Sequence, residues 1–165
     1  MILKAQNEDE KAVILAYVAS KMGTTPKDVV GDMPYTAIAT ARGSRPTGGV
    51  IYTNYRGHSL EMSCAGEPGW LMPRDLGLLF GYAFVTLGCF TVITTVMRRN
   101  DRARRFNEKL GFEHLGVVES GQTKGDDTIL YKMTRPKCRW IKQPAANVIA
   151  FPKATAHAGA VAHGQ

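Results

Sequence analysis

The stretch of residues 98–112 constrains the fold of this chain more than any other part of the sequence. Asn100 or Asp101 is suited to cap the start of a helix, because either side chain accepts hydrogen bonds from the free N–H groups of a first turn. Apolar residues then recur at helical spacing, at Ala103, Phe106 and Leu110. Gly111 follows, and glycine allows the left-handed conformation that ends many helices. The stretch therefore predicts a short amphipathic helix with both ends marked.

Extended segments flank this predicted helix. Residues 89–97 read Cys-Phe-Thr-Val-Ile-Thr-Thr-Val-Met, and this run of β-branched and apolar side chains predicts a buried strand. Phe112 begins a second extended run, which continues to Val118. The predicted unit is a strand, a basic helix and a further strand.

The rest of the chain predicts a mixed α/β (α+β) domain over residues 1–141. Its other predicted elements are a strand at 2–6, a helix from Asn7 or Glu8 to Gly23, a helical turn at 27–30, strands at 35–41, 48–55 and 59–65, a helix from about Pro73 to Gly88, and a strand at 128–133. Short connections predict an antiparallel meander in the middle, and the later strand-helix-strand step requires one parallel pair. We expect a mostly antiparallel sheet of six to seven strands flanked by three to four helices.

Two regions are expected to lack regular structure. The polar stretch at 119–127 is predicted to be a loop between the last two strands. Residues 142–165 are rich in Ala, His and Gly and show no periodicity, which predicts a flexible tail.

The stretch at 98–112 also resembles a known family. Its pattern is Asn100-x-x-Ala103-x-x-Phe106-x-Glu108-Lys109-Leu110-Gly111-Phe112, which is similar to the last conserved block of the GNAT acyltransferases. Within this family, the pattern most resembles the branch that acetylates ribosomal-protein N-termini and the GNAT-like proteins of phage genomes. Downstream residues fit the ending of that subgroup: Gly116, Asp126 or Asp127, the run at 131–133 and the run at 138–140. The predicted element order matches the GNAT fold independently of this motif.

Bulk composition sets the broad class. A chain of 165 residues with 44% apolar and 21% charged residues is typical of one soluble globular domain. No window offers about 20 uninterrupted apolar residues, and no secretory signal begins the chain, so a cytoplasmic protein is expected, in a bacterial host if a phage encodes it. The cysteines lack metal-ligand spacing, which predicts free thiols and no zinc or iron site.

The net charge of +7 is concentrated in two groups of basic residues. The first group lies on and just before the predicted helix: Arg98, Arg99, Arg102, Arg104, Arg105 and Lys109. The second group is Lys132, Arg135, Lys137, Arg139 and Lys142. One interpretation is a solvated helix face. The other is an anionic partner, either the phosphates of coenzyme A or a nucleic acid bound through the five arginines. These charges are not interleaved with exposed aromatic residues that could stack on bases, which weakens a single-strand-binding role.

The resemblance implies acetyl-CoA as a cofactor. In the GNAT fold its pantetheine arm lies between the third meander strand and the strand after the long helix, with the pyrophosphate at the start of that helix. The corresponding candidates are Met62, Ser63, Cys64, Trp70, Arg74 and Asn100. The usual phosphate signature is an Arg or Gln, two residues, Gly, one residue, and Gly or Ala. Here Arg74-x-x-Gly77 lacks the second small residue, and Glu67 and Asp75 oppose an anion.

Acyl transfer to an amine requires a base and an acid. Glu61 is the main candidate for the base, with His58 as a second, and each is also explained as an ordinary strand or turn residue. Asn107 occupies the position where many GNAT enzymes place a catalytic Tyr, and an amide does not donate a proton at neutral pH. Asn100 matches the residue that the ribosomal branch uses to orient cofactor or substrate. A role as an ordinary helix cap explains it equally well. The candidates for a substrate groove are Tyr52, Tyr55 and Tyr131.

Three functional hypotheses follow. The first is an acetyl-CoA-dependent N-acyltransferase acting on an amine of a protein or small molecule. The second is a phage-type GNAT-fold protein without acetyl transfer, acting in nucleic-acid modification or binding. The third is a virion-associated scaffold. The sequence does not identify the acceptor, and a homodimer through edge strands is compatible with it.

Overall fold

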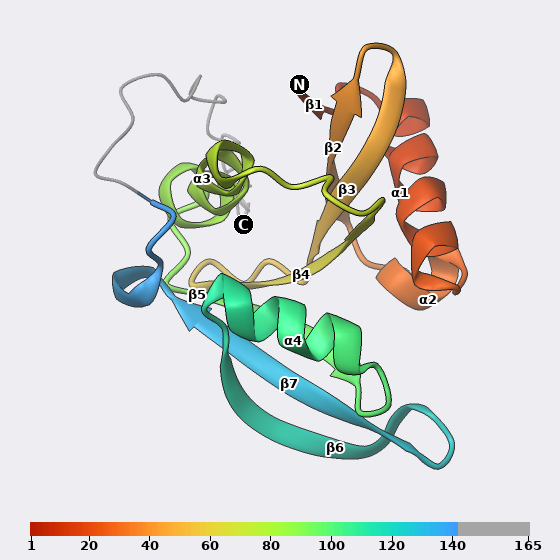
Figure 1. The fold of residues 1–165 in the computed structure, drawn as a ribbon, viewed down its shortest axis with the longest axis vertical. Helices are drawn as coiled ribbons and strands as arrows, with labels where there is room; N and C mark the ends of the chain where they lie inside the picture. Colours follow the sequence, from red (N-terminus) through yellow and green to blue (C-terminus); the bar gives the residue numbers. More distant parts are fainter. Residues whose placement is uncertain (142–165) are drawn as a thin grey trace, which may run out of the picture.

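The computed structural model describes residues 1–141, so the predicted tail at 142–165 lies outside the described residues. These residues form one seven-stranded sheet in the order β1-β2-β3-β4-β5-β7-β6 (Figure 1). The strands are β1 (Ile2–Lys4), β2 (Tyr35–Arg42), β3 (Arg45–Thr53), β4 (Ser59–Gly66), β5 (Thr91–Met97), β6 (Glu113–Thr123) and β7 (Asp126–Thr134). The helices are α1 (Glu8–Met22), α2 (Pro26–Val30), α3 (Pro73–Gly81) and α4 (Asp101–Leu110). The predicted fold class is confirmed.

Strand pairing is antiparallel everywhere in this sheet except between β4 and β5. The parallel pair is short, because it joins only Ser59, Leu60 and Glu61 to Thr91, Val92 and Ile93. Beyond those positions the two strands separate. This interruption divides the sheet into an N-terminal half, β1 to β4, and a C-terminal half, β5 to β7.

Helices cover the two faces of the sheet unequally. One face of the N-terminal half packs against α1 and α2, through a small apolar cluster that includes Leu15, Val18 and Ile51. The opposite face packs against α3 and α4 across both halves, in a larger cluster that includes Phe80, Phe84 and Tyr131 (Figure 1). No helix within residues 1–141 is long and apolar enough to cross a membrane.

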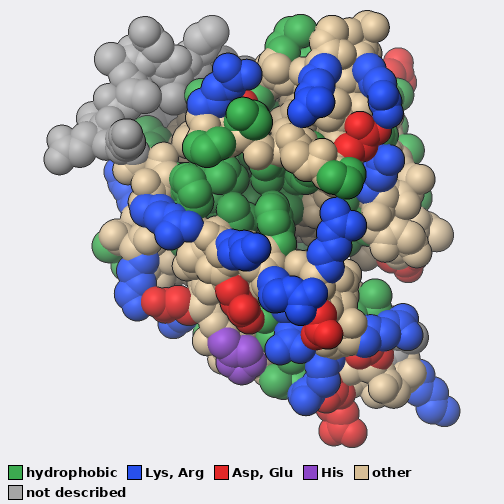
Figure 2. Space-filling view, in the orientation of Figure 1, with side chains coloured by type: hydrophobic (Ala, Val, Ile, Leu, Met, Phe, Trp, Pro, Cys, Tyr) green, Lys and Arg blue, Asp and Glu red, His purple; other side chains and the backbone are tan. Residues whose placement is uncertain are grey.

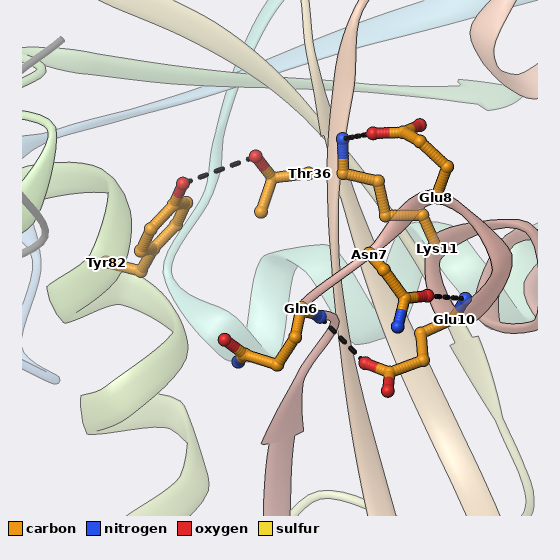
Figure 3. A network of polar contacts seen from close by, with 7 residues as sticks. All are labelled: Gln6, Asn7, Glu8, Glu10, Lys11, Thr36 and Tyr82. Carbon is orange, nitrogen blue, oxygen red and sulfur yellow. Dashed lines mark hydrogen bonds and ion pairs between the residues drawn. The ribbon is translucent and has the colours of Figure 1, made fainter.

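The start of α1 follows from its sequence. The Oδ1 atom of Asn7 accepts a hydrogen bond from the backbone N–H of Glu10 at 2.9 Å, as expected for a helix cap (Figure 3). The Glu10 carboxylate in turn accepts from the backbone N–H of Gln6 at 2.7 Å, and Lys11 pairs with Glu8 at 2.7 Å. These contacts satisfy donors that the first turn would otherwise leave free, so the predicted helix start is confirmed.

The helix predicted from about Pro73 changes type before it ends. The sequence predicts one helix from about Pro73 to Gly88, whereas α3 ends at Gly81 and a π-helical turn follows at Tyr82–Thr86. The wider turn places the Tyr82 ring 5.1 Å from that of Tyr52, and the Tyr82 hydroxyl 3.3 Å from the Thr36 hydroxyl (Figure 3). Contacts with distant strands therefore override the local helical pattern.

Several strand boundaries also differ from the prediction. The polar stretch at 119–127 is largely a hairpin, in which β6 runs to Thr123 and β7 begins at Asp126. Gly125 has φ of 82°, a conformation that glycine adopts readily, and this allows the tight turn. Likewise β3 begins at Arg45, which pairs with Arg42, rather than at Gly48. Polar side chains do not prevent strand formation where the hairpin faces water on both sides.

Candidate functional site

The separation of β4 from β5 creates the main candidate site. Beyond Glu61, residues 62–66 of β4 keep their ladder with β3 but have no strand partner on the β5 side among residues 1–141. Backbone N–H and C=O groups at such an edge require partners, and an extended ligand can supply them as an added strand. Figure 2 shows a hollow with hydrophobic side chains between α3 and α4, and Lys and Arg side chains around its margin.

Glu61 lies at the point where the two strands part. Its neighbours Leu60 and Met62 point into the core beneath α3 and α4, so the alternation of a strand directs Glu61 to the opposite face. The side chain is partly accessible, and its Oε1 atom accepts a hydrogen bond of 2.7 Å from the Asn54 amide. The amide oxygen of Asn54 accepts one of 2.9 Å from Arg56. Glu61 is therefore an oriented carboxylate in contact with solvent.

The predicted cofactor residues of β4 lie in the open segment. Met62 is buried in the core and Ser63 faces away from it, while Cys64 packs against the core. Burial raises the pKa of the Cys64 thiol to about 12. Because the thiolate is the nucleophilic form, this pKa argues against a nucleophilic role for Cys64 near neutral pH.

Trp70 lies on the end of the β3–β4 pair. Gly48 and Gly66 are directly paired across these strands, and their lack of side chains makes room for the indole ring. A Cβ atom at Gly48 would approach that ring to 2.0 Å, and one at Gly66 to 2.4 Å. Trp70 thus fixes the connection between β4 and α3 against the sheet.

The start of α3 differs from a typical anion site. The buried carboxylate of Asp75 accepts a hydrogen bond from the backbone N–H of Met72 at 3.1 Å. Within the preceding loop, the N–H of Glu67 bonds to Thr47 at 2.8 Å and the N–H of Trp70 to Glu67 at 3.1 Å. Several donors that could hold a phosphate are therefore already used by the protein, and Asp75 adds a negative charge where a bound anion gains from the helix dipole.

Arginine side chains flank the same loop. Arg42 donates to the carbonyl of Gly69 at 3.4 Å, and Arg74 is exposed on the first turn of α3, 3.7 Å from Asp75. Arg45 is less available, because it forms an ion pair of 2.5 Å with Glu67. Arg42 and Arg74 are the side chains best placed to meet an anion at this end of the hollow.

The two candidate asparagines are both on α4. The Asn100 Oδ1 atom accepts from the N–H of Ala103 at 3.1 Å, so Asn100 is the helix cap that the sequence predicts. Asn107 is buried, and helical spacing places it on the same face as Ala103 and Leu110, which pack toward the core. Gly111 ends the helix with φ of 102°, as predicted.

The structure does not bring the three candidate tyrosines to Glu61. Tyr52 and Tyr131 are buried beneath the helices on the opposite face, where their hydroxyls bond to the Leu79 carbonyl at 3.0 Å and to Glu108 at 3.3 Å. Tyr55 donates to the Leu87 carbonyl at 3.1 Å. Tyr52 and Tyr55 line an open pocket of about 140 Å³ at the start of β4, which is small for a ligand site.

Ion pairs reduce the charge of the basic helix. Arg98 pairs with Asp127 at 2.9 Å and Arg99 with Asp126 at 3.0 Å, both on β7. Arg104 pairs with Asp101 at 3.2 Å, and a hydrogen bond with Tyr131 raises the pKa of Arg104. Of the five arginines proposed for nucleic acid, only Arg102 and Arg105 form no ion pair with another residue of 1–141.

Sequence reasoning missed Asn54 and Arg56, which hold Glu61. The only local signal in the sequence is the residue type, because Asn enters the left-handed region more readily than most residues, and Asn54 does so with φ of 50°. Nothing in the sequence pattern shows that its amide contacts a carboxylate seven positions later.

Comparison with known proteins shows which solved structures share this fold. No protein-family model and no curated protein sequence matches the chain. Among solved structures, one assigned as an acetyltransferase is 23% identical over 68% of this chain, with a TM-score of 0.57, and the chain spans only 63% of that protein's length. An acetyltransferase structure from Salmonella typhimurium with its cofactor acetyl-CoA is 15% identical, with 88% of this chain and 96% of that chain covered and a TM-score of 0.60.

A third solved structure is the spermidine N-acetyltransferase of Vibrio cholerae in complex with CoA and spermine. It is 16% identical, with 83% of this chain and 96% of that chain covered and a TM-score of 0.62. The ribosomal-protein and phage branch suggested by the sequence stays a prediction, because none of these three structures carries that description. Residues 1–141 have the fold of the GNAT acetyltransferases.

Proposed function

We propose that this protein is an N-acetyltransferase that moves an acetyl group from acetyl-CoA to an amine. The observation that carries the proposal is the separation of β4 from β5 with a carboxylate, Glu61, at the point of divergence. This arrangement combines an open strand edge for an extended donor with a base beside it.

The open edge of β4 suits the pantetheine arm, because that arm is extended and contains amide groups that can pair with a strand. The start of α3 suits the phosphates less well, since the Asp75 carboxylate occupies the Met72 N–H and adds a negative charge there. Arg42 and Arg74 would therefore bind the phosphates through their side chains. The acetyltransferase structure with acetyl-CoA supports this choice of donor.

Glu61 would accept the proton that the amine loses, directly or through a water molecule. Its hydrogen bond from Asn54 fixes the orientation of the carboxylate, and the partly accessible position allows the proton to leave to solvent. Acetyl-CoA, when bound, supplies a thioester carbonyl that the amine attacks, with the thiolate as leaving group. Asn107 can offer a hydrogen bond but not a proton, so it does not serve as the general acid.

The proposal is tested by the Glu61→Gln variant in an acetyl-transfer assay with a panel of primary amines. We expect kcat/KM to fall by about 10²-fold or more, because general base catalysis typically contributes 10²–10⁴-fold. Affinity for acetyl-CoA should stay unchanged, since the carboxylate faces away from the α3 and α4 side. Glu119→Gln, a change on the exposed end of β6, serves as the matched control. Equal activity of Glu61→Gln and Glu119→Gln would contradict the assignment of the base.

A further inference from the structure

A row of side chains crosses the sheet on the face that carries Glu61. The strand registers pair Glu61 with Ile93 of β5, Ile93 with Lys132 of β7, and Lys132 with Glu113 of β6. Residues paired in this way point to the same face. Because two strand spacings separate Glu61 from Lys132, their Cα atoms lie roughly 10 Å apart. A base and a cation thus stand on one surface, with an apolar residue between them.

This part of the face is accessible. The helices α1 and α2 pack over the N-terminal half of the sheet, whereas α3 and α4 lie on the opposite face. Ile93 and Lys132 are accordingly partly accessible, and Thr95 is exposed. The Gln122 amide donates to the Thr95 hydroxyl at 3.1 Å, which brings the end of the β6–β7 hairpin to the margin of this surface.

Lys132 has no acidic partner of its own among the described residues. Its neighbour Glu113 is already engaged by Lys137 at 2.6 Å. A hydrogen bond from Lys137 lowers the pKa of the Glu113 carboxyl, followed by the charge of Lys137 and, least of these, the charge of Lys132. No ion pair among residues 1–141 therefore holds the Lys132 ammonium group, which leaves it available to a ligand bound at Glu61.

From this row we propose that the acceptor is an amine that also carries an anionic group, such as a carboxylate, a few atoms from the nitrogen. The inference rests on the acetyltransferase function proposed above and names its substrate class. The amine nitrogen would lie at Glu61 and the anionic group at Lys132, with the linking carbon atoms against Ile93. A polyamine would instead place a second cation beside Lys132, where like charges repel.

The test uses three amines with the same four-carbon chain: 4-aminobutyrate, butylamine and putrescine. The full-length protein should acetylate 4-aminobutyrate with the highest kcat/KM and putrescine with the lowest. Lys132→Ala should lower kcat/KM for 4-aminobutyrate by about tenfold, the loss expected for one charge-assisted contact, and leave butylamine unchanged. Lys132→Glu should shift the preference toward putrescine. Lys124→Ala, in the exposed hairpin turn, is the matched control.

The outcomes separate the two proposals. Putrescine used as well as 4-aminobutyrate, or a Lys132→Ala loss of the same size for all three amines, would overturn the assignment of the acceptor class while leaving acetyl transfer intact. Absence of acetylation of every amine, together with absence of acetyl-CoA binding in calorimetry, would overturn the acetyltransferase function itself. A thermal melt of each variant excludes loss of folding as the cause.

Discussion

At the scale of single residues, the orientation of Glu61 depends on a residue outside its own strand. Asn54 holds the Glu61 carboxylate at 2.7 Å while adopting φ of 50°, and Arg56 holds Asn54 at 2.9 Å. Most residues pay about 1–2 kcal/mol to enter the left-handed region, whereas Asn and Gly enter it more easily. Asn54 therefore both tolerates the left-handed backbone conformation and positions the Glu61 carboxylate.

We predict that Asn54→Ala lowers kcat about tenfold, because a base that is no longer oriented spends less time in a productive geometry. Affinity for acetyl-CoA should be unchanged. The same variant should also lose about 1 kcal/mol of unfolding free energy, because alanine disfavours the positive φ. Asn54→Gly separates the two effects: it tolerates that backbone conformation but lacks the amide. Wild-type kcat in Asn54→Gly would show that the hydrogen bond does not position Glu61.

The thiol of Cys64 gives a pH-dependent prediction. Burial raises its pKa from 9.0 to about 12 in the folded protein, so the folded state keeps a proton that the unfolded state releases near pH 9. Stability should therefore be insensitive to this group below pH 9 and fall as pH rises above it. Alkylation of Cys64, located by mass spectrometry, should be slow at pH 8 in the folded protein and fast in urea. Fast alkylation under native conditions would contradict the burial of this thiol.

At the scale of elements, the start of α3 distinguishes this chain from a helix that binds phosphate with backbone N–H groups. The Asp75 carboxylate accepts from the backbone N–H of Met72, and the preceding loop forms backbone hydrogen bonds within itself and to Thr47. Any affinity for the phosphates of coenzyme A must then come mainly from side chains, of which Arg74 and Arg42 are nearest to the loop. Such binding should be more sensitive to single substitutions and to salt than binding by a backbone cradle.

Arg74→Ala should weaken acetyl-CoA binding about tenfold, the loss expected for one charge-assisted contact, as measured by calorimetry. Acetyl-pantetheine, which lacks the nucleotide phosphates, should bind the variant and the wild type equally. Lys27→Ala is a suitable control, because Lys27 belongs to α2 and pairs with Asp32. Unchanged affinity for acetyl-CoA in Arg74→Ala would show that the phosphates lie elsewhere.

At the scale of the whole molecule, the order of elements was predictable because each helix and strand has local signals. Asn7, Asn100 and Gly111 mark helix ends, and the structure confirms all three. Features that depend on distant contacts were not predictable: the π-helical turn held by Thr36 and Tyr52, and the hairpin at 119–127. The registers that join Glu61, Ile93 and Lys132 link strands about 30 to 40 residues apart, so the sequence pattern does not show that the three side chains share one face.

Isothermal titration of the full-length protein with acetyl-CoA tests the central claim most directly, which is that the separated strands β4 and β5 form a donor site. We predict one saturable site with micromolar affinity, and the same affinity in Glu61→Gln, because that carboxylate lies at the base of the site and faces the acceptor side. Lack of binding at millimolar acetyl-CoA by a folded sample would contradict it.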